Sequence, residues 1–486
     1  MGDYSVPETI RAMKPRGTIV KRIKGHYYVY TCRNEKRDDG KWHLTTGKAI
    51  GSVREGIGFV PNDGYNSEGR ASVLEYGRYA PALTSSLGEL ERLERHFNPL
   101  EATEIYVLAL LFCADGYMPL KSVGEHYTQS YLSVRYPSLR MGASSLSGLL
   151  DSLGRYRERQ EAYQQELLGT AENIAVDGHC VESYSRGDCL AQYGNKYGET
   201  GEMQVNLLVA YDISGEAPVL ARMYPGGMLD KTSVRDLLSG YKFRGKLFIV
   251  DRGFYSAANL ELLSRDGNDY IIPLSENLEE YKGVAGTLDY RQSFVYHAGG
   301  KPHPVFFHEG QGIKSGRVII YRDMDRAAYE EDSFKKRIGT SAEYTEERLG
   351  RLRDGFGVMV LRTSLDSAKG ADEVFRLYKR RWSIETYNDI LKNRDGFVAL
   401  GQGDYYVTQG LSFVVLVAGR IEAAFRRKCK DTKNTGRTPD DILLSAQFVK
   451  IQKRDGKWET INTSKKLIEL FNAFDCPVIG NLGLPT

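Results

Sequence analysis

Two aspartates in this sequence each follow a short run of apolar residues. Asp177 comes after "NIAV" and Asp251 after "LFIV", runs that are typical of buried strands. In α/β sheets, functional sites are built at the carboxyl ends of strands. A carboxylate placed there is partly desolvated and needs a cation or another polar partner. The sequence therefore predicts that both side chains serve a polar site, although a single strand-end aspartate more often only caps a helix or a turn.

A third carboxylate lies in residues 378–396, a segment that looks at first like a charged surface helix. Four of its residues stand at offsets 0, 3, 7 and 14: Tyr378, Arg381, Glu385 and Lys392. At about 100° of rotation per residue, these offsets fall within an arc of roughly 60°. A helix face that packs on a core should be apolar, so this polar face indicates contact with a ligand. Its arginine could bind a phosphate with two hydrogen bonds, and its tyrosine could stack or donate a hydrogen bond.

Asp177, Asp251 and Glu385 together would make a set of hard oxygen ligands suited to Mg²⁺. Two such ions about 4 Å apart can activate a water or a 3′-hydroxyl and stabilise the leaving oxygen of a phosphodiester. We therefore predict a site for two Mg²⁺ ions, for which Mn²⁺ can substitute. His179 could assist a metal-bound water, but a ring packed beside the strand end is the more common arrangement.

The elements around these residues follow a recognisable order. From residue 172 the sequence reads strand, strand, strand, helix, strand, helix, strand, as far as "DYIIPL". Residues 275–365 then alternate glycine-rich and β-rich pieces around a charged helix near 325–352. Before the core, residues 14–60 read as short strands with a hairpin turn at "RNEKRDDG", and residues 86–168 read as helices.

Composition is that of a globular protein, with 486 residues, 41% hydrophobic, 27% charged and a net charge of +3. The longest apolar run, residues 410–419, is half the roughly 20 residues of a membrane helix, and we expect a buried helix or strand there and no membrane partner. Neither a secretory signal nor a C-x-x-C pair occurs, which favours a reducing cytoplasm. Basic clusters at 14–30, with Lys21, Arg22 and Lys24, and at 426–437 could bind phosphates, although such runs are usually solvated surface.

Four motifs together resemble one known family. The pattern Y-x2-R-x3-E-x6-K, filled by Tyr378, Arg381, Glu385 and Lys392, resembles the YREK signature of bacterial insertion-sequence DDE transposases. "IAVDGH" and "FIVDRGFYS" look like the two aspartate motifs of that family, and "ARMYPGGMLDKTS" is similar to its stretch between them. The resemblance covers about residues 172–396.

The resemblance implies an α/β fold: an RNase H-like catalytic core with a mixed five-stranded sheet and helices, interrupted by a mostly β insertion. A β-then-helical N-terminal DNA-binding region would precede the core. It assigns catalysis and metal binding to Asp177, Asp251 and Glu385. Contacts to the transposon end would come from Tyr378, Arg381 and Lys392, with Arg252 as a further phosphate contact. The expected partner is DNA, both terminal inverted repeats and target, with a homodimer in the synaptic complex and a nucleoid-associated location in a bacterial or archaeal cytoplasm.

The predicted domains follow from these elements. They are a basic β-rich region (1–85), a helical region (86–171), the first part of the core (172–274), the β-rich insertion (275–365), the catalytic helix (366–400) and a C-terminal region (401–486).

One departure from the family concerns a tryptophan that can stack on a flipped base in related enzymes. Residues 275–365 contain none, and Tyr296, Phe306 or Phe307 could substitute, although they fit strand cores better. Two other functions remain open: an RNase H-like nuclease acting on structured DNA without strand transfer, and a domesticated DNA-binding relative without catalysis.

Overall fold

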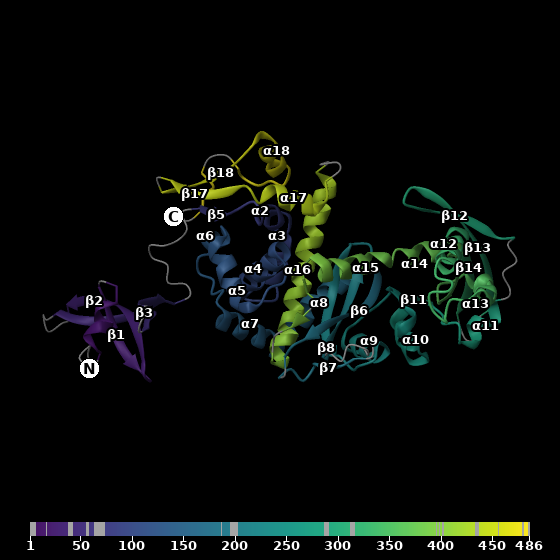
Figure 1. The fold of residues 1–486 in the computed structure, drawn as a ribbon, viewed down its shortest axis with the longest axis horizontal. Coiled ribbons are helices and arrows are strands. Elements are labelled where there is room, and N and C mark those ends of the chain that lie inside the picture. Colours follow the sequence, from purple (N-terminus) through teal and green to yellow (C-terminus); the bar gives the residue numbers. More distant parts are fainter. Residues whose placement is uncertain are drawn as a thin grey trace. The chain divides into compact units, whose positions relative to one another are not determined.

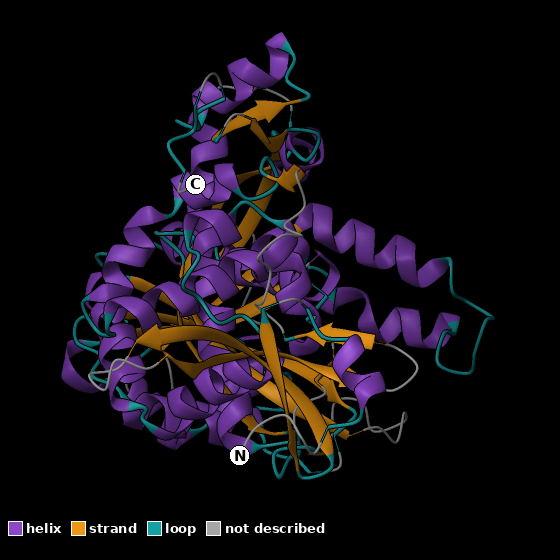
Figure 2. Cartoon of the chain, turned by 90° about the vertical axis from the view of Figure 1, so that its left-hand side faces the viewer, coloured by secondary structure: helices purple, strands orange, loops and turns teal. Residues whose placement is uncertain are grey.

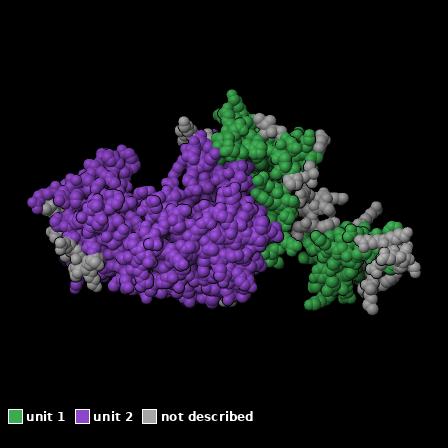
Figure 3. Space-filling view, turned by 180° about the vertical axis from the view of Figure 1, so that it is seen from behind, with its two compact units in different colours: residues 1–79, 119–146, 443–486 green, residues 80–118, 147–442 purple. Residues whose placement is uncertain are grey.

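The structure is a computed structural model that groups the chain into two compact units (Figure 3). One unit comprises residues 1–79, 119–146 and 443–486, and the other comprises 80–118 and 147–442. The described residues are 6–15, 17–36, 42–54, 58–62, 73–185, 187–194, 203–285, 291–311, 316–394, 396–397, 399–400, 403–432, 437–454, 456–478 and 481–484.

The N-terminal residues of the first unit form an antiparallel sheet in the order β1-β2-β3-β4. Its strands are β1 Thr18–Ile23, β2 His26–Lys36, β3 Trp42–Arg54 and β4 Gly58–Pro61. Val20, Val29, Ile50 and Val53 form its core together with Ile10 of the short helix α1 Glu8–Ala12. The predicted strands are present, and β2 also includes the first half of the predicted hairpin turn. The rest of that turn, residues 37–40, lies outside the described residues.

The remainder of the first unit joins segments that are far apart in the sequence (Figure 1). A three-stranded sheet has the order β18-β17-β5. Tyr76 packs on Tyr131 and Phe471, with ring centroids 4.9 and 5.9 Å apart. The elements of this part of the first unit are β5 Val73–Glu75, β17 Lys450–Arg454, β18 Lys457–Ile461, α5 Leu120–Gln129, α6 Leu132–Arg135 and α18 Lys465–Ala473.

The second unit contains the predicted mixed five-stranded sheet, in the order β9-β8-β6-β10-β11. Its strands are β6 Asn173–Ser183, β8 Met203–Asp212, β9 Ala217–Pro225, β10 Leu247–Val250 and β11 Asp269–Pro273. The first three strands pair antiparallel, whereas β10 pairs parallel with both β6 and β11. Helices α9 Asp230–Gly240 and α10 Ala257–Leu263 connect the later strands. This topology confirms the α/β fold and the strand-helix order predicted from the sequence.

The insertion extends the same sheet. Beyond β11 the order continues β15-β14-β13-β12, and every added pair is antiparallel. Its elements are α11 Glu279–Ala285, β12 Ser293–Ala298, β13 Lys301–Gln311, β14 Arg317–Asp323, α12 Met324–Lys335, α13 Glu346–Leu352 and β15 Val358–Thr363. The single charged helix expected near 325–352 is therefore two helices. Phe375 of α14 (Ala371–Lys379) packs against Phe294 and Tyr321 of the insertion.

A 27-residue helix, α16 Tyr405–Asp431, packs along β9 and the helix α4 Pro99–Asp115. Figure 1 labels α16 and α4, and Figure 2 distinguishes the helices of the chain from its strands by colour. It includes the apolar run 410–419, so the helical alternative for that run is correct. It alone among the described helices has the length and hydropathy of a membrane span, but 89% of its apolar window is buried inside the protein.

Glycines allow α7 (Ala143–Arg155) to cross α16 closely. A Cβ on Gly154 or Gly410 would lie 1.9 or 2.1 Å from a carbonyl oxygen of the other helix, so neither position accepts a larger residue.

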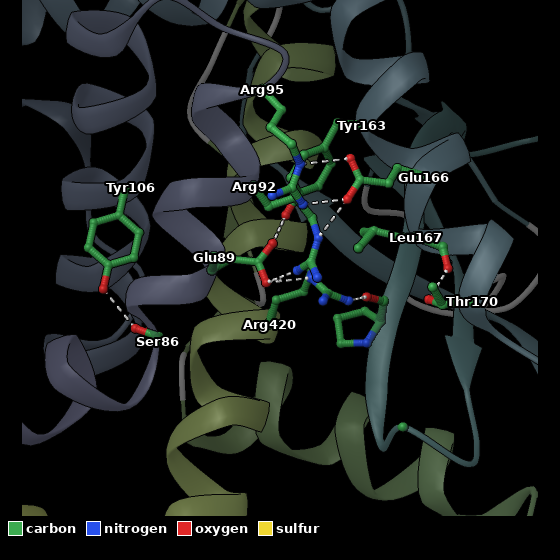
Figure 4. Close-up of polar contacts among 12 residues, drawn as sticks. Ser86, Glu89, Arg92, Arg95, Tyr106, Tyr163, Glu166, Leu167, Thr170 and Arg420 are labelled. Carbon is green, nitrogen blue, oxygen red and sulfur yellow. Dashed lines mark hydrogen bonds and ion pairs between the residues drawn. The ribbon is translucent and has the colours of Figure 1, made fainter.

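A polar network fixes three helices of this unit to one another: α3 Leu87–Glu94, α8 Glu158–Thr170 and α16 (Figure 4). Glu89 is buried and pairs at 2.9 Å with both Arg92 and Arg420. Glu166 accepts from Arg92 and Arg95 and pairs with His96. The hydrogen bond from Arg95 is the main cause that lowers the pKa of Glu166 to about 2.

Candidate active site

Asp177 and Asp251 lie side by side on neighbouring parallel strands. The register pairs Val176 of β6 with Val250 of β10, and each aspartate is the next residue of its strand. Whereas β10 ends there, β6 continues to Ser183 because β8 pairs with it along its whole length. Asp177 therefore lies inside a strand and not at its end, which corrects the sequence interpretation. Where β10 ends, Asp251 follows at the register position next to Asp177 on β6.

Asp251 also has the capping role considered from the sequence. Its Oδ1 accepts a hydrogen bond from Arg252 N at 2.8 Å and so caps the 3₁₀ turn Arg252–Phe254. The cap uses one carboxylate oxygen, and the backbone N–H of Arg252 supplies the donor. The Arg252 side chain itself is exposed beside the aspartate.

Glu385 lies on α15 (Trp382–Asp389) and faces the same cavity as Asp177. The cavity has a volume of about 510 Å³ and is mainly polar. Its lining residues are Asp177, Gly178, His179, Cys180, Glu385, Asn388, Asp389 and Lys392. The structure thus brings one of the two strand aspartates, the helix glutamate and the predicted phosphate-binding lysine to one cleft.

The helix that carries the polar face is not regular. It is divided into α14 and α15, and a π-helical turn, Ile390–Arg394, follows. Between the two helices the backbone keeps helical angles, and Arg381 N donates to Tyr378 O at 3.0 Å. In this i to i+3 geometry residues three apart eclipse one another, so the Arg381 guanidinium lies 5.8 Å from the centre of the Tyr378 ring. Single π turns inside helices are frequent at functional sites.

Arg381 is the charged centre of the site. Its guanidinium donates to Glu385 Oε1, and the two side chains are 13% and 29% exposed. Burial by itself lowers the pKa of this guanidinium, but its neighbours together raise it above the usual value: Tyr378, Glu385, Asp251 and Asp177. For Tyr378, by contrast, burial disfavours the charged phenolate and raises the pKa, so the hydroxyl stays protonated. Arg381 therefore lies within electrostatic reach of all three carboxylates, including Asp251, which does not line the cavity.

The donor set fits a hard divalent cation in its chemistry, since carboxylate oxygens are the ligands that Mg²⁺ prefers. The three carboxylates are nevertheless not gathered as closely as ligands of one ion. Among the described residues, only His303, Asp323 and Asp325 in the insertion bring their ligand atoms within 4.8 Å of one another. Glu385 is instead held by Arg381, and Asp177 Oδ2 accepts from Asn388 Nδ2 at 2.8 Å. Asn388 was not singled out in the sequence, although its place three residues after Glu385 puts it on the same helix face.

The remaining predicted residues lie in two different settings. His179 is buried, and its Nε2 lies 3.1 Å from the carbonyl oxygen of Phe397. Lys21 and Arg22 on β1 lie over the rings of Tyr30 and Tyr27, at 5.3 and 5.7 Å. Lys24 is exposed in the β1–β2 turn, with a positive φ of 48°. These three basic residues belong to the first compact unit, and the candidate catalytic residues belong to the second.

The aromatic residues of the insertion contribute to packing. Tyr296 contacts Phe375 with ring centroids 5.4 Å apart, and Phe307 contacts Phe294 at 5.9 Å. Phe306 is partly buried on β13. Trp382, by contrast, is 68% exposed at the start of α15.

Comparisons with known proteins agree with a transposase-type domain. Residues 169–397, a little under half of the chain, match the family model described as "Transposase DDE domain". The matched region includes both aspartates, Glu385 and Lys392. One similar solved structure is described as "Cryo-EM structure of piggyBac transposase synaptic complex with hairpin DNA (SNHP)". It has 10% identity and a TM-score of 0.40 over 76% of this chain and 80% of that chain, a likeness too low to carry an argument. No curated protein matches the sequence.

Proposed function

We propose that this protein is a DNA transposase that binds the terminal inverted repeats of an insertion sequence, cleaves the ends and joins them to target DNA. The main support for this proposal is the register of β6 and β10, in which Asp177 and Asp251 follow the paired residues Val176 and Val250. Glu385 shares a cleft with Asp177, and all three lie within the residues that match the DDE domain. Two adjacent strand carboxylates opposite a helix carboxylate are the arrangement that phosphodiester cleavage with divalent cations needs.

The three carboxylates would hold two Mg²⁺ ions, or Mn²⁺ in their place. When bound, such ions lower the pKa of a water or hydroxyl nucleophile and neutralise charge on the leaving oxygen. The chain's own part is to place these oxygens. The Arg381 guanidinium competes with a metal ion for Glu385, so it must leave Glu385 before the carboxylate can serve as a ligand.

Arg381 and Lys392 would then bind phosphates of the transposon end. The raised pKa of Arg381 keeps its guanidinium charged at any working pH, and its planar fork suits two phosphate oxygens. Lys392 lines the same cavity from the π turn. Tyr378, protonated and beside Arg381, can donate its hydroxyl hydrogen to a phosphate oxygen. Arg252, exposed next to Asp251, is positioned for a further contact.

We also propose that end recognition is shared with the N-terminal sheet. Arg22 and Lys24 are exposed there, and Lys21 is half-buried, so their charges are available to phosphates. The domain boundaries predicted above, and a homodimer in the synaptic complex, are parts of the same proposal. Replacing Lys21, Arg22 and Lys24 together by Gln should weaken end binding in a mobility-shift assay, while a matched change of exposed lysines Lys335 and Lys336 should not.

The experiment that tests the proposed function supplies both substrates at once. Duplex DNA taken from the region flanking the gene, with its inverted repeats, is incubated with the protein, a target plasmid and Mg²⁺. A transposase produces free 3′-hydroxyl ends at the repeat boundary and joined target products. Cleavage without any joining would instead indicate a nuclease, and binding without cleavage a non-catalytic relative.

A further inference from the structure

Asn388 connects the catalytic helix to the catalytic strand. It lies one turn after Glu385 on α15, and its Nδ2 donates to Asp177 Oδ2 at 2.8 Å. It also lines the cavity that contains both carboxylates. Asn388 therefore links Asp177 on the strand to the helix that carries Glu385.

The amide oxygen of Asn388 has no hydrogen-bond donor within the described part of the chain. This oxygen, Oδ1, is buried in the protein. A buried acceptor without a donor costs about 1–3 kcal/mol, and an apolar side chain of the same size would avoid that cost. An amide retained here at such a cost is consistent with a donor that arrives from outside the chain.

The two carboxylates next to the cavity are held by different kinds of donor. Glu385 is paired with the cationic Arg381, which competes with any metal ion for the carboxylate charge. Asp177 accepts hydrogen bonds from the neutral amide of Asn388 and from the backbone N–H of Gly178, donors that orient the carboxylate without adding a charge of their own. Neutral donors that orient a ligand in this way are typical of metal sites, and losing one commonly weakens metal affinity 10- to 100-fold.

We propose that Asn388 is a positioning residue of the cation site. Its N–H fixes the orientation of Asp177, and its Oδ1 accepts a hydrogen bond from a water or hydroxyl that enters the cavity with the cation. This inference rests on the proposed function, because it takes Asp177 to be a metal ligand.

The test measures Mn²⁺ binding by calorimetry on the full chain without DNA, so that catalysis does not enter the readout. In the Asn388→Leu variant, which keeps the size but removes both polar arms, Mn²⁺ affinity should fall about 10- to 100-fold. The Mn²⁺ concentration for half-maximal cleavage should rise by the same factor. Thr386→Ala, on the same helix but away from this cavity, is the matched control and should bind Mn²⁺ as the wild type does.

A second variant keeps the test decisive if Asn388→Leu folds poorly. Asn388→Asp has the same shape but replaces the N–H donor by an oxygen, so two carboxylates then face each other. A cation relieves that repulsion, and Mn²⁺ should therefore raise the melting temperature of this variant more than that of the wild type. An equal shift in both proteins would overturn the proposal, as would wild-type Mn²⁺ affinity in Asn388→Leu.

The variant Asp177→Asn distinguishes a failure of the metal site itself from a failure of the role proposed for Asn388. If this variant loses Mn²⁺ binding while Asn388→Leu retains it, the role of Asn388 is wrong and the metal site stands. If Asp177→Asn binds Mn²⁺ as tightly as the wild type, both the metal site of the proposed function and the role of Asn388 are wrong.

Discussion

The ion pair between Arg381 and Glu385 predicts that removing this carboxylate strengthens DNA binding in the absence of metal. Arg381 cannot donate to Glu385 and to a phosphate with the same hydrogen atoms, so the two partners compete for it. The variant Glu385→Gln removes the charge of one competitor and retains the shape of the side chain. Arg381 is then free to bind DNA before any cation arrives.

The size of the effect follows from the burial of the pair. A hydrogen bond to a charged group contributes about 1.5–3 kcal/mol, which corresponds to roughly a 10- to 150-fold change in affinity. Because the Glu385 side chain is still 29% exposed, solvent screening favours the lower end of that range. We therefore expect Glu385→Gln to bind the transposon end about tenfold more tightly than the wild type in EDTA.

Fluorescence anisotropy of a labelled end duplex measures this gain, and two controls identify its source. Asp389→Asn removes a neighbouring exposed carboxylate that has no ion pair in the described part of the chain, so it reports the general loss of repulsion. The double variant Arg381→Gln, Glu385→Gln removes the arginine as well. Equal gains in Glu385→Gln and Asp389→Asn, or a gain that survives the loss of Arg381, would refute the competition.

Three further predictions concern other charged residues. Arg381→Lys should reduce end binding or strand processing, because an ammonium lacks the planar fork of a guanidinium. Arg380→Lys preserves charge equally on an exposed side chain and should have little effect in the same assays. Identical activity of both variants would contradict a phosphate contact by Arg381. Lys392→Gln should reduce the slope of log affinity against log salt by roughly one unit, measured as an anisotropy series. Glu166→Gln should destabilise the fold by about 1–2 kcal/mol at pH 7 after allowance for screening. The lowered pKa of Glu166 means that its contribution is present above about pH 4.5 and is lost as the pH falls towards 2, so urea unfolding of the two proteins should converge in acid.

The local sequence predicted the core well because its strands and helices are short and bounded by clear signals. "LFIVDRGFYS" indicated a buried strand followed by a turn at Asp251, which are β10 and the 3₁₀ turn Arg252–Phe254. The place of Asp177 could not be derived in this way. Where β6 ends depends on its long pairing with β8, which is a property of the sheet and not of the residues after "NIAV".

The polar face of the segment that carries Glu385 was predicted from a uniform rotation per residue, and the structure departs from that assumption twice. The 3₁₀-type bonds after Tyr378 and the π turn at Ile390–Arg394 tighten and widen the helix in succession. Lys392 nevertheless lines the cavity with Glu385. Side-chain pairing was beyond the reach of periodicity, since the contact of Asn388 with Asp177 joins residues 211 positions apart.

We propose that Asp177, Asp251 and Glu385 together cleave DNA ends with divalent cations. Asp251→Ala tests it most directly, since Asp251 does not line the mapped cavity and its role rests on strand register alone. Purified wild-type and variant proteins are compared on the same end-bearing duplex in Mg²⁺, with cleavage read on a denaturing gel and binding by mobility shift. We expect Asp251→Ala to bind the end as the wild type does and to produce no cleaved strand. Cleavage that persists in Asp251→Ala would contradict the proposal.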